Sequence, residues 1–389
     1  MSTRGWALPR ISDATLRDFA HMAGVEFTEH DAATIAQLLV EVGIDVIEAG
    51  IISADDMRDA PVVRAALVAA GPTRVQTLVL ARHRQQVERD LAVAQAIGCT
   101  AVMLSVPTSP THARLKLGTE SRQRIIALAR SGIEIGKEMG FTVEYSAEDG
   151  ARTDPAFLEE YVAIGERVGA DRFRLAETVS TLRPETTAEL IARLLHAAPT
   201  LPIQLHSHNV FGLAVANAIT AFEAGARWIS TTVNGLGERG GNTPLAELLC
   251  ALWSFFGDRR YNLSSLTKLS EEVVRRSGLH PGLTAGPVGA LSYAYEIAGQ
   301  VQNPEAFEAV PAELVGNRRR VRVASRLRPA LLKACLPREL AEAADLPGLT
   351  NQLLHQVQSG HGPLDHDSIV AAAKAFCSVH AGSVATAGE

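Results

Sequence analysis

Residues 202–224 read PIQLHSHNVFGLAVANAITAFEA and combine two kinds of local pattern. The first part, PIQLHSH (202–208), is a short apolar run typical of a β-strand, whereas residues 213–224 are typical of a helix. Two parallel strands need a long crossover connection, which a helix usually provides. A strand followed by a helix therefore predicts a parallel sheet, provided that the pattern recurs along the chain.

The pattern recurs eight times between residue 11 and about residue 256. Each candidate strand is rich in Val, Ile, Leu or Thr and is followed by a helical segment. Eight such units fit the size of a (β/α)8 TIM barrel in the α/β class, whereas an open doubly wound sheet usually has fewer. Residues 16–24, LRDFAHMAG, also lack the glycine pattern of a dinucleotide-binding loop. The predicted strands span residues 11–18, 44–50, 75–81, 100–107, 141–148, 171–178, 202–208 and 228–235.

The alternation ends near residue 257, and a different region follows. Residues 262–389 read as helical segments joined by loops. We therefore predict a barrel over residues 1–257 and a smaller, mostly α-helical C-terminal region over residues 258–389. In the latter, the basic stretch NRRRVRVASRLRP (317–329) favours a solvated strand and turn over an anion contact.

Composition and charge exclude several classes of protein. With 47% hydrophobic and 21% charged residues, the chain has the composition of a globular protein, and its formal charge of −6 gives no general attraction to nucleic acid. No apolar run is long enough to span a membrane, and MSTRGWALPR (1–10) lacks an apolar signal core, so we predict a cytoplasmic protein without membrane contact. The four cysteines form no CxxC pair, which argues against a disulfide framework and a thiolate zinc site.

Polar side chains gather at the predicted strand ends. In TIM barrels the catalytic groups lie at the C-terminal ends of the strands, on one rim. Six strands deliver polar residues to that rim, and the loop GLGERGGN (235–242) follows the eighth strand. The residues concerned are Arg17, Asp18, Glu48, Glu148, Thr178, His206, His208, Asn234 and Asn242.

Two histidines of this set predict a metal site. His206 and His208 are two residues apart on one strand, so their side chains point to the same face. Such a pair could simply bond to its neighbours, but Asp18 on the first strand, which adjoins the eighth in a closed barrel, favours metal binding. Imidazole nitrogens with carboxylate and amide oxygens suit Mg²⁺, Mn²⁺, Zn²⁺, Co²⁺ or Fe²⁺.

Two further rim residues each allow two interpretations. Arg17 either forms a salt bridge at the rim or grips the carboxylate of an α-keto acid. Glu148 either caps the following helix or acts as a general base toward a bound substrate. The residues alone leave both alternatives open.

Three motifs resemble the isopropylmalate synthase and homocitrate synthase family of DRE-TIM metallolyases: TLRD (15–18), HSHNVFGLAVANA (206–218) and NGLGERGGN (234–242). YSAEDGARTD (145–154) is similar to the fifth-strand segment of that family, and ELVGNRRRV (313–321) is similar to its later region. Members join the methyl carbon of acetyl-CoA, or of a related acyl-CoA, to the ketone of a 2-oxo acid and hydrolyse the thioester. The resemblance implies the same Claisen-type condensation, giving a 2-substituted malate, with acetyl-CoA as co-substrate.

The resemblance also implies roles for individual residues. Arg17 would polarise the keto group, Glu148 would assist proton transfer and Thr178 would contact the carboxylate of the keto acid; we place Glu48 in the substrate-binding set as well. The C-terminal region would form a lid and a homodimer interface, and a chain ending at residue 389 is expected to lack the domain with which many isopropylmalate synthases sense leucine. The ligands of a divalent metal ion (Mn²⁺, Mg²⁺, Zn²⁺ or Co²⁺) would be Asp18, His206, His208 and Asn242.

Two departures from the family bear on the chemistry. After LRD the family continues G-x-Q, whereas this chain has Phe19, Ala20 and His21; we expect Phe19 to reshape the keto-acid pocket and His21 to offer an acid/base group. The family's lid histidine and tyrosine align with Glu296 and Phe307. Glu296 is then a candidate substitute base. The alternatives nearby are His280, Tyr293 and Tyr295.

Three functions follow from these residues. The first is the condensation of an acyl-CoA with a 2-oxo acid. The second is a CoA-independent, metal-dependent aldolase or lyase that acts on a hydroxy-oxo acid with His21 as base. The third is a protein without catalysis that only binds metabolites or a partner, which the intact set of predicted metal ligands disfavours.

Overall fold

The computed structural model describes residues 8–385, without the side chains of residue 361 and residues 379–385. The chain divides into two compact units, with the boundary between Pro281 and Gly282. Residues 1–7, which form most of the N-terminal stretch discussed above, lie outside the described part. Within that part, no helix combines the length and the apolar character that a membrane span needs.

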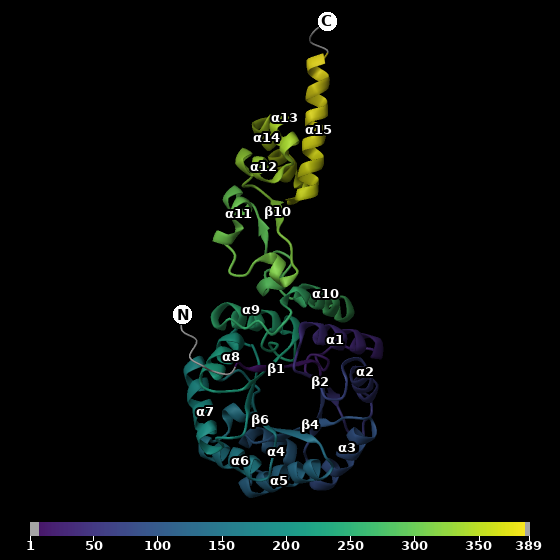
Figure 1. Cartoon of the computed structure of the whole chain (residues 1–389), viewed down its shortest axis with the longest axis vertical. Coiled ribbons are helices and arrows are strands. Elements are labelled where there is room, and N and C mark those ends of the chain that lie inside the picture. Colours follow the sequence, from purple (N-terminus) through teal and green to yellow (C-terminus); the bar gives the residue numbers. More distant parts are fainter. Residues whose placement is uncertain (1–7, 386–389) are drawn as a thin grey trace. The chain divides into compact units, whose positions relative to one another are not determined.

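The first unit is a closed barrel of eight parallel strands arranged in sequence order (Figure 1). All eight predicted strands are confirmed, and the TIM barrel with them. The strands are β1 (Arg10–Leu16), β2 (Val46–Ile51), β3 (Val75–Leu80), β4 (Ala101–Pro107), β5 (Thr142–Glu148), β6 (Arg172–Glu177), β7 (Ile203–Ser207) and β8 (Trp228–Thr231).

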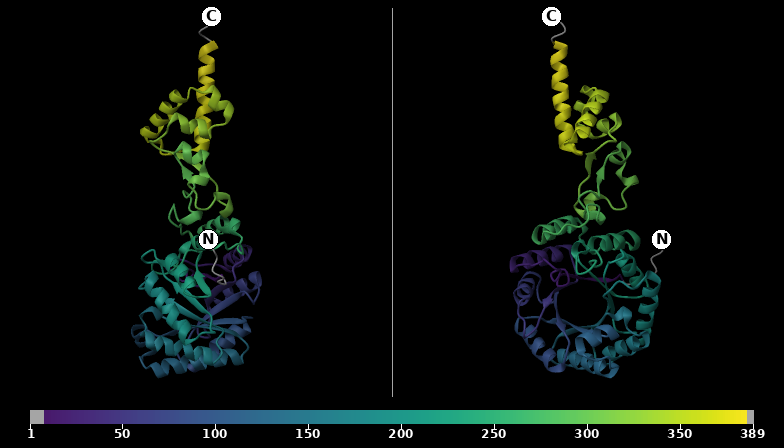
Figure 2. Two further views of the ribbon diagram at one scale, coloured as in Figure 1. Left: turned by 60° about the vertical axis from the view of Figure 1, so that its left-hand side comes forward. Right: turned by 180° about the vertical axis from the view of Figure 1, so that it is seen from behind.

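Helices surround the strands on the outside of the barrel, as the right-hand view of Figure 2 shows. Local signals set their ends: Thr28 forms a capping box at the start of α1, and Gly43 ends that helix in the left-handed conformation. One short helix, α4, was not predicted. The helices are α1 (Glu29–Val42), α2 (Ala60–Ala70), α3 (Arg84–Ala96), α4 (Pro110–Leu117), α5 (Arg122–Glu138), α6 (Pro155–Arg167), α7 (Pro184–Ala197), α8 (Ala214–Glu223) and α9 (Leu245–Phe256).

The interior of the barrel contains a buried network of charged side chains. Arg174 on β6 is 1% exposed and donates to Glu48 on β2, with Nη1 at 2.9 Å, and to Glu144 on β5, with Nε at 2.8 Å. Glu144 also accepts from Arg172 at 2.6 Å and from Gln76 at 2.8 Å. Charges buried this deeply are tolerated only when they are paired and hydrogen-bonded, so the network fixes the mutual positions of these strands.

The first unit extends beyond the predicted boundary at residue 257. Helix α10 (Leu266–Ser277) carries Arg276, which forms an ion pair with Asp31 at the start of α1. The backbone N–H of Asn262 donates to the carbonyl of Val42, at 2.9 Å. Both contacts tie the segment after α9 to the barrel, which is why the compact unit ends at Pro281.

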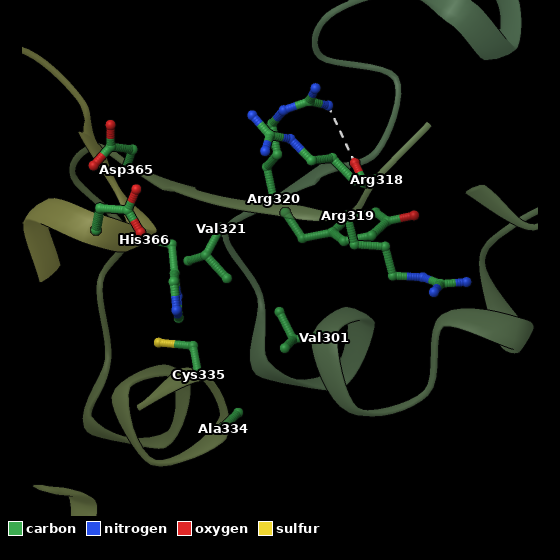
Figure 3. A pocket seen from close by; sticks show the side chains of 11 residues that line it. Val301, Arg318, Arg319, Arg320, Val321, Ala334, Cys335, Asp365 and His366 are labelled. Atoms are coloured by element: carbon green, nitrogen blue, oxygen red, sulfur yellow. Dashed lines mark hydrogen bonds between the residues drawn. The ribbon is translucent and has the colours of Figure 1, made fainter. Parts of the chain in front are cut away.

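The second unit is mostly helical, as predicted, and contains a small sheet that the sequence indicated only in part. Strand β10 (Arg320–Val323), which falls in the basic stretch, pairs with β9 (Ala294–Tyr295) and β11 (Leu364–Asp365). A cavity of about 600 Å³ borders β10, with Val321, Cys335 and His366 among its walls (Figure 3). The helices are α11 (Ala298–Gln302), α12 (Pro329–Cys335), α13 (Arg338–Ala343), α14 (Leu346–Gln356) and α15 (His366–Ala385).

Candidate active site

Three predicted metal ligands meet at the C-terminal rim of the barrel. Asp18 follows β1, His206 lies on β7 and His208 follows that strand. Each offers one ligand atom, and these atoms lie within 4.8 Å of one another. All three side chains are buried, and the two imidazole rings stand perpendicular with their centroids 5.2 Å apart. This geometry could hold a metal ion.

The protonation states of the three residues favour a cation. Burial lowers the pKa of both His206 and His208 below the ordinary value, so both rings are neutral near pH 7. Burial opposes ionisation of Asp18, but the positive charge of Arg17 and further interactions outweigh it and lower the pKa of that carboxyl. The site thus presents two imidazole lone pairs and a carboxylate, the forms that bind metal.

The hydrogen bonds of His208 show which nitrogen carries its lone pair, and that lone pair accepts from Arg239. Arg239 can only donate, and its Nη2 atom lies 2.7 Å from Nε2 of His208, so Nε2 carries the lone pair. The proton is therefore on Nδ1, which lies 3.1 Å from the carbonyl oxygen of Gly241. His206 has an analogous second contact, from Nδ1 to the hydroxyl of Ser230 at 3.0 Å. Such outer contacts orient metal-binding histidines.

Asn242 adds an unsatisfied oxygen beside this cluster. Its Nδ2 atom donates to Oδ2 of Asp18 at 2.8 Å. Its Oδ1 atom is buried and has no hydrogen-bond partner in the described part of the chain. A buried amide oxygen without a partner is costly, and a metal ligand role would satisfy it. The donor set of two imidazoles, one carboxylate and one amide oxygen fits a divalent ion.

Arg17 is held rigidly next to this cluster. Its Nη1 atom is 2.5 Å from Asp18 Oδ1, and its Nη2 atom is 2.9 Å from Glu48 Oε2. Glu48 also accepts from Ser12 and Arg174 and is not among the residues that line the cavity, so its contact with the substrate stays a prediction. It lies deep in the barrel, because β2 continues to Ile51, three residues farther. Glu48 positions Arg17.

Glu148 at the end of β5 lies among three donors, none of which was predicted. Oε1 of Glu148 contacts His112 Nδ1 at 2.7 Å and the ammonium of Lys116, and Ser105 Oγ lies 3.4 Å from Oε2. Burial raises the pKa of Glu148, but hydrogen bonds and charges, first those of Lys116, outweigh it and lower the pKa below its ordinary value. The missed signal is the His-x-x-x-Lys spacing, which places both on one face of α4.

A cavity of about 280 Å³ connects these groups. Thr178 borders it, and its hydroxyl oxygen accepts from the backbone N–H of Asp149 at 3.1 Å. The lining residues are Arg17, Asp18, His21, Ile51, Leu78, Leu80, Arg82, Met103, Ser105, His112, Lys116, Ser146, Glu148, Arg174, Ala176, Thr178, His206, His208, Glu238 and Arg239.

Phe19 and His21, the residues that replace the family's usual sequence after LRD, lie in different environments. His21 borders the cavity, and its Nε2 atom is 2.8 Å from Oδ2 of Asp59. Phe19 is fully buried and packs edge-to-face on Phe27, with the ring centroids 5.6 Å apart. Phe19 is not among the lining residues, and its effect on the keto-acid pocket stays a prediction. The chain turns back after β1, because the N–H groups of residues 17 and 18 donate to the carbonyl of Ala14.

Two other predicted residues have hydrogen-bond partners within their own units. Asn234 directs its amide to the carbonyl of Ser270 on α10, at 3.3 Å. Glu296 belongs to the second unit, where its Oε1 atom accepts from the backbone N–H groups of Ala324 and Arg326, at 2.9 and 2.8 Å. The catalytic role suggested for Glu296 therefore stays a prediction.

Comparison with known proteins gives consistent relatives. The HMGL-like family model matches residues 8–273. The chain is 36% identical over 320 residues to (R)-citramalate synthase of Methanocaldococcus jannaschii, covering 80% of this chain but only 63% of that relative. It is 36% identical to 2-phosphonomethylmalate synthase of Streptomyces rubellomurinus (80% and 82% covered) and 35% identical to a homocitrate synthase of Methanopyrus kandleri (80% and 78%).

Solved structures share the fold. The HMG-CoA lyase of Brucella melitensis superposes with a TM-score of 0.60, at 18% identity, over 70% of this chain and 99% of that chain. At that identity the likeness supports the barrel architecture alone.

Proposed function

The chain belongs to the HMGL-like family and to its isopropylmalate and homocitrate synthase group, and on that premise we propose that it condenses acetyl-CoA, or a related acyl-CoA, with a 2-oxo acid. The product is a 2-substituted malate. One observation carries the proposal: Asp18, His206 and His208 converge on one point beside Arg17. The names of the relatives supply the reaction class.

Asp18, His206, His208 and Asn242 would hold the divalent ion, and Mn²⁺ and Mg²⁺ are the first ions to test. When bound, such an ion supplies positive charge to the keto and carboxylate oxygens of the substrate, which makes the carbonyl carbon electrophilic. The remaining steps depend on side chains of the barrel.

Arg17 stabilises the negative charge that develops on the former keto oxygen. Its contacts with Asp18 and Glu48 use Nη1, Nη2 and Nε, and each terminal nitrogen keeps a second N–H for the substrate. Because both carboxylates fix the guanidinium in advance, it needs no reorganisation when charge develops. Thr178 accepts a hydrogen bond from Asp149, which leaves its own hydroxyl proton free for the substrate carboxylate.

Glu148 assists proton transfer as an ionised base. Lys116 and His112 keep it charged at neutral pH, and both can return a proton along the same contacts.

We propose Glu296 as the base that removes the proton of the acyl methyl group, supplied by the partner subunit of a homodimer. The dimer and the lid role of the second unit rest on the family resemblance. Sedimentation equilibrium tests the dimer, and a monomer under assay conditions would contradict it.

The proposed reaction is tested by release of free thiol from acetyl-CoA with Mn²⁺ or Mg²⁺ and a panel of 2-oxo acids. We expect thiol release with at least one acid and bound metal in the purified protein. The His208→Ala variant should lose both thiol release and bound metal. His196 is an exposed histidine on the outer helix α7, so His196→Ala is the matched control and should keep thiol release and bound metal. Absence of thiol with every acid, while metal is bound, would contradict the proposal.

A second candidate, the CoA-independent aldolase or lyase, is favoured by one contact. Asp59 accepts from the backbone of Ile51 at 2.7 Å and holds His21 at the cavity edge, an arrangement suited to a base. The test is release of pyruvate from a 4-hydroxy-2-oxo acid without CoA. If His21→Ala keeps the wild-type rate, His21 is not the base.

A further inference from the structure

The cavity has an apolar side opposite the metal cluster. In the ring of eight strands, β3 and β4 lie across from β7 and β8. From this side the cavity is lined by Leu78 and Leu80 on β3, by Met103 and Ser105 on β4 and by Arg82, two residues beyond β3. Leu78, Leu80 and Met103 provide the apolar surface. A 2-oxo acid whose carboxylate and keto oxygens face β1 and β7 would direct the rest of its carbon chain here.

Arg82 differs from the other cationic side chains of this cavity in its partners. Arg17, Arg174 and Arg239 each form ion pairs with carboxylates, and so do Lys116, His112 and His21. The guanidinium of Arg82 contacts the carbonyl oxygen of its neighbour Ala81, at 3.2 Å. Among residues 8–385, no carboxylate forms a salt bridge with it. The cavity therefore contains a cation whose charge the protein does not balance by contact.

This arrangement is unfavourable without a ligand. Arg82 is half-buried, and burial lowers the pKa of its guanidinium, with Glu148 opposing that effect from a distance. Glu148 is already occupied by Lys116 and His112. The planar fork of a guanidinium matches the oxygens of a carboxylate or a phosphonate, and binding such a group would replace the lost hydration.

We propose that Arg82 determines substrate specificity by binding a second acidic group at the far end of the 2-oxo acid. This inference rests on the proposed condensation and narrows it to substrates with a distal carboxylate or phosphonate. The methylene groups between the two ends pack against Leu78, Leu80 and Met103, whose apolar surfaces suit them.

The test compares acids with and without the distal charge. Thiol release is measured with oxaloacetate, 2-oxoglutarate and 3-phosphonopyruvate, and with the uncharged analogues pyruvate, 2-oxobutyrate and 2-oxoisovalerate. We expect a charged acid to exceed its uncharged counterparts in kcat/KM by roughly 10- to 100-fold, the usual effect of one charge-assisted contact. Which of the three charged acids has the highest kcat/KM shows whether the distal group is a carboxylate or a phosphonate.

Variants at residue 82 test whether Arg82 causes the preference for acids with a distal charge. Arg82→Met should abolish the preference by raising KM for the charged acid while leaving KM for acetyl-CoA unchanged. Arg82→Lys should keep part of it, since the charge remains without the fork. Arg84→Met is the matched control, because Arg84 is exposed at the start of α3 and does not line the cavity. A rise in KM for acetyl-CoA alone would overturn the proposal.

Calorimetric binding keeps the two proposals separate. With Mg²⁺ and no acetyl-CoA, 2-oxoglutarate should bind the wild type more tightly than 2-oxobutyrate does, and the difference should disappear in Arg82→Met. Thiol release that favours uncharged acids would overturn the role of Arg82 and leave the condensation standing. If no acid yields thiol, the condensation fails, and equal binding of the two acids would then refute the Arg82 site as well.

Discussion

Glu148 illustrates how a carboxylate stays charged in a partly closed cavity. Burial alone would raise its pKa, and the contacts with Lys116 and His112 reverse that effect. The ionised form is present above the lowered pKa and is lost when the pH falls through it. An activity that needs this base therefore rises with pH on its acid limb.

Replacing Lys116 should move that limb. In Lys116→Met the burial effect is less opposed, so the pKa of Glu148 rises and the acid limb of kcat/KM shifts to higher pH. The measurement is thiol release across pH. Lys137→Met is the control, because Lys137 pairs with Asp171 at 2.7 Å and does not line the cavity. An acid limb that stays in place in Lys116→Met would show that Glu148 is not the titrating group.

The sequence allowed part of the site to be predicted at the level of residues. Asp18, His206 and His208 were predicted together because the strand period and barrel closure determine which side chains share a face. The surroundings of Glu48 and Phe19 could not be predicted. They depend on how far a strand continues and on where the chain turns back, and the two-residue period of a strand determines neither.

Between elements, packing of α6 on β5 depends on one glycine. A Cβ atom at Gly165 would lie 2.1 Å from the hydroxyl of Tyr145, which cannot easily move because it donates to the carbonyl of Val162 at 3.0 Å. Its ring also packs on Tyr161 and Phe173. Gly165 therefore permits the close approach of this helix to the strand.

Gly165→Ala should lower the free energy of unfolding by about 1–3 kcal/mol through overpacking. Urea denaturation measures the change. The control is Gly299→Ala in α11, where an added Cβ has no neighbour within 4 Å. Equal stabilities of the two variants would mean that Tyr145 finds another position at no cost.

Most elements were predictable, and the contacts between them were not. The eight strands follow from short apolar runs alternating with helical segments. Helix α4 was missed because its eight residues have little apolar periodicity, and with it His112 and Lys116. Their partnership with Glu148 joins two βα units, which no local pattern records.

At the scale of the whole molecule, two units with separate hydrophobic cores predict two unfolding transitions. The second unit has its own cluster, which includes Leu331, Leu349 and Ile369. In differential scanning calorimetry, Mn²⁺ at about 100 times its dissociation constant should raise only the barrel transition, by roughly 5–10 °C. The His208→Ala protein should lose this shift. A single transition that moves as a whole would show that the units unfold together.

The boundary between the units shows why domain limits were harder to predict than strands. The βα alternation ends near residue 257, but α10 still packs on the barrel through Arg276 and Asp31. A break in periodicity marks the end of a repeat, whereas a compact unit ends where tertiary contacts end.

The buried network of Glu48, Glu144, Arg172 and Arg174 has a consequence for the history of this chain. Loss of one member leaves an uncompensated charge and costs about 3–5 kcal/mol, whereas exchange of the whole set for apolar residues can be neutral. Evolution by single substitutions within this network therefore passes through destabilised intermediates, which simultaneous substitutions avoid. Because Glu48 also forms an ion pair with Arg17, a change in the buried network would also disturb the active site. New substrate specificities are therefore more readily acquired by substitutions on the β3 and β4 side of the cavity, which is not part of this network.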